Sequence, residues 1–163
     1  MRLPRKCIGT LLLLVTAAAP VLAQARASQF DGAWRQVRNE VVSPDSTYRL
    51  PLLSGMTVVS GRHFSQIYLN APPAGVQQAS RPTSDDEKAR RYELLTANAG
   101  TFEVRDTLIV YHFLHAKSPS VVGTSVTRRF RVRGDTLWLV TLQPFSKDST
   151  KTVRSTGTFV RER

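Results

Sequence analysis

The stretch Thr124-Ser-Val-Thr-Arg-Arg-Phe-Arg-Val-Arg-Gly-Asp-Thr-Leu-Trp-Leu-Val-Thr-Leu142 decides the fold. Residues 124–133 and 136–142 are rich in β-branched and aromatic side chains, which favour strands. Only Gly134-Asp135 separates the two segments, and a link this short requires the strands to run antiparallel. The stretch therefore predicts a β-hairpin.

Strand-like segments recur on both sides of this hairpin. Further strands are expected at 33–42, 56–60, 62–70, 101–105, 107–115 and 151–161. Eight segments of ordinary strand length predict an all-β fold, an eight-stranded antiparallel meander. Closing such a sheet into a barrel would remove its unpaired edges. An eight-stranded barrel is either filled by side chains or holds one small ligand.

One short helix is expected at residues 84–97, between the third and fourth strands. Ser84-Asp85-Asp86-Glu87 has the Ser-x-x-Glu spacing of a capping box, and its acidic residues suit the positive end of the helix dipole. Ala89, Tyr92 and Leu95, at steps of three, would line one face of the helix, and Gly100 is placed to end it.

Residues 1–25 have the pattern of a signal peptide. A basic start is followed by the apolar run Ile8–Leu22 and by small residues at two cleavage points, after Ala23 or after Ala25. A membrane anchor is the alternative, but the apolar run is shorter than the roughly 20 residues that a span requires. We therefore expect an exported protein, periplasmic or secreted, with no membrane span.

Cleavage would remove the only cysteine, Cys7, so the mature chain would hold neither disulfides nor thiols. It would also lower the formal net charge from +11 to +8. The basic residues are spread along the chain, except at residues 128–133, which argues against a nucleic-acid partner. Solubility, or a loose attraction to an anionic envelope, accounts for the charge.

Several short motifs, in order, resemble the bacterial lipocalin-like domain proteins. The motifs are Gly32-Ala33-Trp34, Ser60–Ser65, Asn98–Val104, Pro119-x-x-x-Gly123, Arg128-Arg129-Phe130 and Gly134–Leu139. The resemblance implies an eight-stranded lipocalin-type barrel over residues 29–163, with a cavity for a small apolar molecule. It also implies that Trp34 plugs one barrel end beneath an arginine of the last strand, Arg161 or Arg163, of which Arg161 is our candidate.

Alternation in the strand 124–133 makes Arg128 a candidate ligand-binding residue. Its even positions include Val126, Arg128 and Phe130, and they form the better inward face. A buried arginine needs a partner, which would be the anionic head of a ligand or a carboxylate such as Glu103.

The histidines do not form a metal site. His112 and His115 are three residues apart, which places them on opposite faces of a strand, and no cysteine or acidic cluster completes a ligand set. We expect His112 as a polar group inside the barrel, bonded to Tyr68 or Tyr111. Ile109 and Phe113 are as apolar as Leu108, Val110 and Leu114. The sequence therefore does not decide which face of the strand 107–115 points inward.

The sequence predicts a non-enzymatic barrel that binds a small apolar or amphipathic ligand without a cofactor. The candidate ligand-binding residues are Arg128, His112, Tyr68 and Phe130. One alternative is an enzyme with His112 as acid–base and Arg128 stabilising an anion. Another is a filled-barrel interaction module whose outer residues 129, 131 and 133 meet the anionic envelope. A cavity of roughly a few hundred Å³ would favour ligand binding or catalysis, and a packed interior the module.

Overall fold

The computed structural model describes residues 27–50, 52–71 and 84–163, without the side chains of residues 52 and 53. The strands are β1 (Gly32–Val42), β2 (Thr47–Arg49), β3 (Leu52–Ser60), β4 (His63–Asn70), β5 (Leu95–Arg105), β6 (Leu108–Ala116), β7 (Ser125–Arg133), β8 (Thr136–Phe145) and β9 (Asp148–Arg161). The helical elements among these residues include α2 (Asp85–Leu94) and the 3₁₀ turn η1 (Pro119–Val121). The expected signal peptide lies outside the described residues.

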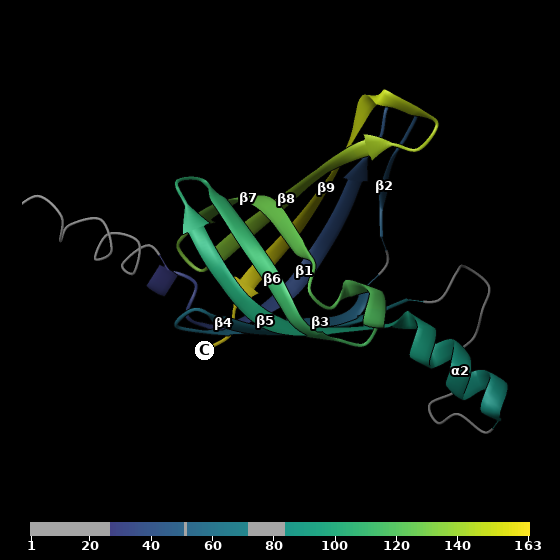
Figure 1. Ribbon diagram of the computed structural model, residues 1–163, viewed down its shortest axis with the longest axis horizontal. Coiled ribbons are helices and arrows are strands. Elements are labelled where there is room, and N and C mark those ends of the chain that lie inside the picture. Colours follow the sequence, from purple (N-terminus) through teal and green to yellow (C-terminus); the bar gives the residue numbers. More distant parts are fainter. Residues whose placement is uncertain (1–26, 51, 72–83) are drawn as a thin grey trace, which may run out of the picture.

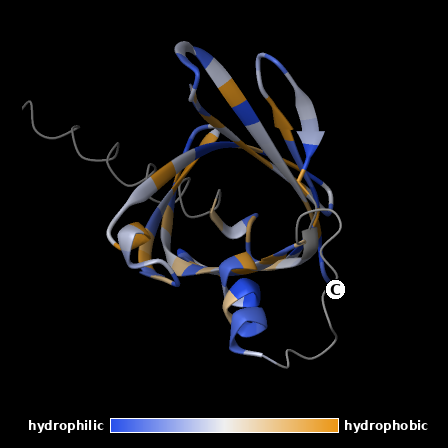
Figure 2. Ribbon diagram, turned by 90° about the vertical axis from the view of Figure 1, so that its right-hand side faces the viewer, coloured by the Kyte–Doolittle hydropathy of each residue, from blue (hydrophilic) through white to orange (hydrophobic). Residues whose placement is uncertain are grey.

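The strands form a closed antiparallel barrel. Neighbours in the sheet follow the order β1-β3-β4-β5-β6-β7-β8-β9, and β9 pairs back with β1. Figure 2 looks along this barrel and shows the strands as a ring. The predicted eight-stranded meander is therefore confirmed. The short strand β2 is an addition, and it pairs with the far end of β1.

Tight turns connect the strands where the sequence predicts them. Gly61 and Gly134 adopt positive φ angles of 59° and 55°, and Asp106 does the same at 53°. This left-handed conformation suits glycine, and aspartate tolerates it better than most residues. The hairpin of β7 and β8 that opened the sequence analysis forms around Gly134, with Arg133 paired to Thr136.

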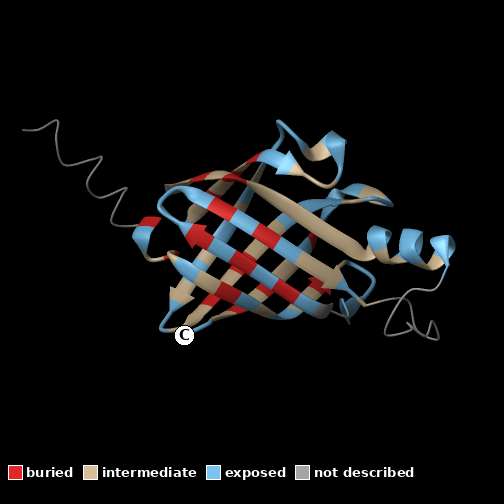
Figure 3. Cartoon of the chain, turned by 90° about the horizontal axis from the view of Figure 1, so that it is seen from below, coloured by how far each residue is buried: buried red, intermediate tan, exposed pale blue. Residues whose placement is uncertain are grey.

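Buried and more exposed side chains alternate along much of the barrel wall, as Figure 3 shows. In β7 the even positions from Val126 to Val132 are half-buried and the odd positions are exposed, as predicted. In β6 the odd positions Ile109, Tyr111 and Phe113 are buried. This settles the inward face that the sequence left open.

The helix α2 is shorter than expected and projects from the barrel (Figure 1). Ser84 caps the helix as predicted, because its hydroxyl accepts a hydrogen bond from the Glu87 amide at 3.2 Å. No residue of α2 is buried, so the predicted apolar face does not pack. The helix ends at Leu94, and Leu95 already belongs to β5.

Gly100 does not end the helix. It lies within β5, where a Cβ atom would stand 1.9 Å from the backbone oxygen of His112. The register of β5 against β6 shifts between Ala99 and Gly100, so a glycine is required for close strand approach at this bulge. A backbone contact, and not a helix cap, accounts for this glycine.

One end of the barrel is extended by two hairpins. The ends of β8 and β9, and those of β1 with β2, rise beyond the other strands in Figure 1. Strand β7 pairs with β8 only from Arg129↔Val140 onward to the Gly134 turn, so the upper part of β8 has no β7 partner. At this end, the barrel wall therefore extends less far along the barrel axis at β7 than at β9. Among the described residues, no helix combines the length and apolarity needed to cross a membrane.

Candidate functional site

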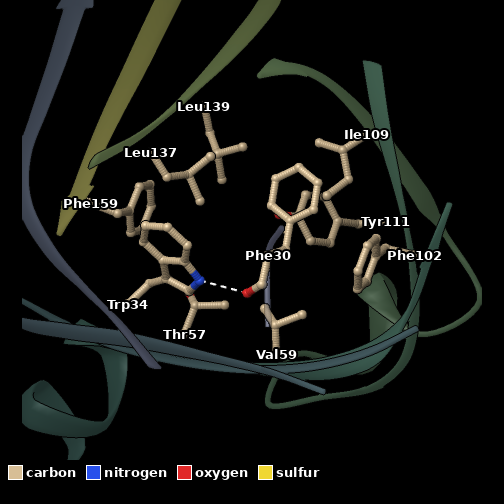
Figure 4. Close-up of a pocket in the computed structure, with 10 residues that line it drawn as sticks. All are labelled: Phe30, Trp34, Thr57, Val59, Phe102, Ile109, Tyr111, Leu137, Leu139 and Phe159. Carbon is tan, nitrogen blue, oxygen red and sulfur yellow. Dashed lines mark hydrogen bonds between the residues drawn. The ribbon is translucent and has the colours of Figure 1, made fainter. Parts of the chain in front are cut away.

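The end of the barrel interior away from the two hairpins is an apolar compartment, with the Phe30 side chain at its centre (Figure 4). Phe30 is 1% exposed and belongs to the turn of residues 27–30 that precedes β1. Its ring packs edge-on against Phe130 and Phe102, with centroid distances of 4.8 and 5.8 Å. The compartment is lined by Trp34, Thr57, Val59, Phe102, Ile109, Tyr111, Leu137, Leu139 and Phe159 together with Phe30.

Trp34 and Arg161 hold this turn in place. The Trp34 indole Nε1 donates a hydrogen bond of 2.6 Å to the Phe30 carbonyl. The Arg161 guanidinium lies 4.1 Å from the centre of the indole ring and donates to the carbonyls of Gln29, at 2.8 Å, and Asp31. Arg163 instead bonds the Asp135 carboxylate at 2.6 Å. The structure thus brings together Trp34 and Arg161, the pair expected at the barrel end.

The free volume left in the apolar compartment is about 10 Å³. That is the space of a single water molecule, and apolar walls disfavour even that. Phe30 therefore fills the position that an apolar ligand would need. Phe130 takes part in this aromatic packing and does not lie with the polar groups described next.

Arg128, Tyr68 and Tyr111 lie near one another inside the barrel, at the border of the compartment that Tyr111 also lines. Arg128 extends inward from β7, and its guanidinium carbon lies 5.4 Å from the centre of the Tyr111 ring. Its charge is also close enough to Tyr68 to influence that phenol. The Arg128 Nε atom is buried and has no hydrogen-bond partner. Arg128 as a whole is half-buried, so burial of its Nε without a partner carries a free-energy cost that an anion beside the guanidinium would offset.

Tyr68 is oriented by two neighbours on the same inner face. Its hydroxyl lies 2.7 Å from the Thr57 hydroxyl and donates to the Gln66 amide oxygen at 3.2 Å. Burial raises the pKa of Tyr68 above its ordinary value, although Thr57 and Arg128 oppose the shift. Burial also raises the pKa of Tyr111. Both phenols are therefore protonated at neutral pH and can donate hydrogen bonds.

His112 does not belong to this group, and its expected position inside the barrel is wrong. It occupies an outward position of β6, where its Nδ1 lies 2.8 Å from the Ser125 hydroxyl and its Nε2 lies 3.5 Å from Glu103. Tyr111, the next residue along the strand, takes the inward position. Both faces of β6 carry apolar residues, so its sequence does not show which face points inward. The neighbouring strand does: Arg128 of β7 points inward and pairs with Ile109, so Ile109 and the other odd-numbered residues of β6 point inward as well.

Glu103 also lies on the outer face and does not pair with Arg128. It binds Arg105 at 2.8 Å, and this partner holds the pKa of the Glu103 carboxyl below its usual range. A barrel enzyme with His112 and Arg128 acting together would require both side chains to converge, and they point to opposite faces. The described residues contain no group of three potential metal ligands.

An open cleft of about 550 Å³ lies between the two projecting hairpins. Buried Val41 and Val153 belong to its lining, and the Tyr48 side chain, 48% exposed, faces it from β2. The Lys147 ammonium and the Asp45 carboxylate join the hairpin tips at 3.0 Å. Arg129 of β7 pairs with Val140 of β8. Arg128 and Thr141 are the next residues beyond this pair on their strands, and Thr141 also lines the cleft. The cleft therefore borders the barrel wall next to Arg128.

The outer face of β7 carries an exposed basic stripe. Arg129, Arg131 and Arg133 alternate with the inward residues and are all exposed, as the alternation predicts. The Arg131 guanidinium lies 5.4 Å from the Trp138 ring centre, so it partly stacks on the neighbouring strand. This stripe and the inward Arg128 face opposite sides of the barrel wall.

Comparison with known proteins identifies the family. The model of the lipocalin-like domain matches residues 31–163, nearly the whole described chain. The crystal structure of Rv2717c from M. tuberculosis is similar at 14% sequence identity and a TM-score of 0.39, over 89% of this chain and 99% of that one. No curated protein matches the sequence. The family match, together with the closed antiparallel barrel, shows that the chain belongs to the lipocalin-like domain family.

Proposed function

We propose that this protein is exported and binds one small amphipathic molecule, whose anionic head is received by Arg128. The observation that carries the proposal is the state of the Arg128 side chain. It points into the barrel, its Nε is buried without a hydrogen-bond partner, and no carboxylate of the described residues forms an ion pair with it. A carboxylate or phosphate head would supply the missing charge and bind through charge-assisted hydrogen bonds.

Tyr68 and Tyr111 would orient the head. Their raised pKa values keep both phenols neutral. The Tyr111 hydroxyl could donate a hydrogen bond to an anion beside Arg128, and Tyr68 could do so by turning its single O–H away from the Gln66 amide oxygen. Two neutral donors and one cation favour a monoanionic or dianionic head over a cationic or apolar one. The Thr57 hydroxyl, 2.7 Å away, would hold the Tyr68 phenol in position by donating to its oxygen.

The body of the ligand would lie in the cleft between the hairpins. Phe30 fills the apolar compartment below Arg128, so the ligand must extend the other way. The cleft volume of about 550 Å³ falls within the range of small-molecule sites, roughly 300–1,000 Å³. Its lining joins Val41, Val153, Leu50 and Tyr48 with hydroxyl and amide groups, which suits an amphipathic body.

Export is supported by the leader pattern of residues 1–25. A mature chain that begins after Ala23 or Ala25 would retain the turn of residues 27–30 and therefore the Phe30 packing. The intact mass of the protein secreted or released from the periplasm tests this directly. A mass that still includes residues 1–23 would contradict the export part of the proposal.

The binding part is tested with the protein purified from its native host. Native mass spectrometry should detect a co-purified anionic molecule of a few hundred daltons. In parallel, titration calorimetry with dodecanoate and with dodecanol should show that only the carboxylate binds. Arg128→Gln should weaken dodecanoate binding by about 10- to 100-fold, because a hydrogen bond to a charged group contributes about 1.5–3 kcal/mol. Equal binding of both probes, or binding unaffected by Arg128→Gln, would refute Arg128 as the head-group site.

The packed apolar compartment favours a second candidate, an interaction module that attaches to anionic envelope through Arg129, Arg131 and Arg133. Such attachment is electrostatic and must weaken as salt rises. Sedimentation with vesicles containing anionic phospholipid, at low salt and at about 0.5 M salt, distinguishes this candidate. Binding that persists at high salt, or in the triple glutamine variant of the three arginines, would contradict it.

A further inference from the structure

Gln66 is a buried carboxamide beside the proposed head-group site. It lies on β4 two residues before Tyr68, so both side chains point into the barrel. Gln66 is 4% exposed, and its Oε1 atom accepts a hydrogen bond of 3.2 Å from the Tyr68 hydroxyl. A phenol has a single O–H, so Tyr68 must give up this bond when it donates to an anion beside Arg128.

The Gln66 Oε1 would then need another donor. Among the described residues, the hydrogen bond to this oxygen comes from Tyr68. The Thr57 hydroxyl lies 2.7 Å from the Tyr68 oxygen and is already used to hold the phenol. A buried carbonyl oxygen that loses its hydrogen bond carries a desolvation cost, which a donor on the ligand would remove.

The distances place that donor close to the anionic head. The Tyr68 oxygen and the Gln66 Oε1 are 3.2 Å apart. A head oxygen bonded to Tyr68 and a donor bonded to Gln66 each lie about 2.7–3.0 Å from these atoms, so they are themselves about 3 Å apart when the four atoms form a ring of ordinary contacts. An amide nitrogen attached to the carbon next to a carboxylate has this separation from the carboxylate oxygen, about 3 Å.

A second carboxamide, Gln36 of β1, lies next to Tyr68. A Cβ atom at Gly55, the residue of β3 opposite Tyr68, would lie 2.5 Å from the Tyr68 ring and 3.2 Å from the Gln36 Cβ. The absence of a side chain at Gly55 therefore lets Tyr68 and Gln36 lie side by side. The Gln36 Nε2 has a long contact of 3.5 Å with the Arg38 carbonyl, so it is available to donate to a ligand oxygen.

Polar side chains continue from Gln36 to the cleft. Asn39 pairs with Gly157, and a Cβ atom at Gly157 would lie 3.2 Å from the Gln36 Nε2, so Asn39 and Gln36 lie on the same inner face. The Ser155 hydroxyl donates to the Asn39 Oδ1 at 3.2 Å, and Ser155 also lines the cleft. Uncharged hydrogen-bonding groups beside the head favour a polar linkage there over a bare alkyl chain.

We infer that the ligand is an acylated α-amino acid. Its carboxylate would bind Arg128, its amide N–H would donate to the Gln66 Oε1, and its amide oxygen would accept from the Gln36 Nε2. A trans amide carries its N–H and C=O on opposite sides, which suits a position between two carboxamides. The acyl chain would lie in the cleft. This inference rests on the proposed function, because it starts from an anionic head beside Arg128.

Titration calorimetry with three anions of equal main-chain length tests the inference on ligand-free protein. The anions are N-dodecanoylglycine, its ester analogue dodecanoyloxyacetate, which lacks the N–H, and pentadecanoate, which lacks both polar groups. N-dodecanoylglycine should bind about tenfold more tightly than pentadecanoate, with the ester between them. A site that recognises the chain by its apolar surface alone would give the reverse order, because pentadecanoate is the most apolar of the three.

Gln66→Met removes the carboxamide at nearly constant length and should abolish the preference for N-dodecanoylglycine. The affinity of the same variant for pentadecanoate reports any effect that reaches the head through Tyr68. Ser65→Ala is the matched control, because Ser65 is the preceding residue of β4 and is exposed on the outer face. Circular dichroism establishes that both variants fold.

A tenfold preference for N-dodecanoylglycine in the wild-type protein and in Ser65→Ala, lost in Gln66→Met, would support the inference. Equal binding of all three anions would overturn it and leave the head-group site at Arg128 intact. So would an ester that binds as tightly as the amide, or a preference that Gln66→Met leaves unchanged. Binding of none of the three anions would overturn the proposed function together with the inference.

Discussion

The guanidinium carbon of Arg161 lies 4.1 Å from the centre of the Trp34 indole ring, which joins the last strand of the barrel to the first. The same guanidinium donates to two backbone carbonyls of the segment that carries Phe30. One side chain of β9 therefore covers the tryptophan of β1 and positions the aromatic plug. Arg161, Trp34 and Phe30 therefore stabilise one another, and we expect the loss of one to weaken the packing of the other two.

Arg161→Ala should lower the free energy of unfolding by about 2 kcal/mol, from the lost cation–π contact and two hydrogen bonds. Urea denaturation measures the change. Arg163→Ala is the control, because the Arg163 side chain is 86% exposed and pairs with Asp135 at the surface. The control should leave the unfolding free energy close to that of the wild-type protein, because exposed ion pairs contribute little. Equal effects of the two variants would show that the stacking over Trp34 is not structural.

Phe30→Ala should lower the free energy of unfolding by about 3–5 kcal/mol, because a fully buried aromatic ring is removed. The turn that carries Phe30 is held by its backbone, so the variant should leave a dry apolar cavity open. Benzene should then bind to the variant and not to the wild-type protein, which NMR titration can detect. Benzene binding by the wild-type protein would mean that the apolar compartment is not filled.

Alkaline pH should destabilise the fold through its buried phenols. Burial raises the pKa of Tyr111 in the folded protein above the ordinary tyrosine value of about 10. The stabilisation from keeping this phenol neutral is therefore complete below pH 10 and is lost as the pH rises above it. Tyr111→Phe should flatten the decline in unfolding free energy between pH 9 and 11.5, about the range in which the phenol of the unfolded chain ionises. Tyr92→Phe, at an exposed position, should leave the decline as in the wild-type protein.

His112→Ala should leave ligand binding within about twofold of the wild-type value, since the ring lies on the outer face. The ring contacts Ser125 and Glu103 there, so its loss should cost only about 0.5–1 kcal/mol of stability. Calorimetry with dodecanoate and urea denaturation measure the two quantities. A loss of binding comparable to that of Arg128→Gln would place His112 in the site after all.

Most of the barrel could be predicted from the sequence because its signals are local. Alternation along residues 124–133 predicts which side of β7 is inward, and Gly134-Asp135 predicts the turn. Two features depend on partners distant in the sequence. The inward face of β6 follows from its pairing with β7, and Gly100 is explained by the backbone of His112 across the sheet. Neither feature can be predicted from the sequence of one strand alone.

The candidate site was predicted only in part for the same reason. Arg128 and Tyr68 occupy the interior, as expected of polar groups in a binding barrel, and their roles stay predictions. Tyr111 replaces His112 because adjacent residues in a strand face opposite sides. The filling of the lower compartment could not be foreseen, because Phe30 precedes the first strand and no periodic pattern directs it inward.

Arg128→Met is the measurement that tests the central claim most directly, because it separates function from stability. If Arg128 is kept for a ligand, its replacement by an apolar side chain of similar length should raise the unfolding free energy of the ligand-free protein by about 1 kcal/mol or more. The same variant should lose at least tenfold in dodecanoate affinity. A variant that is less stable than the wild-type protein and binds dodecanoate equally well would contradict the claim.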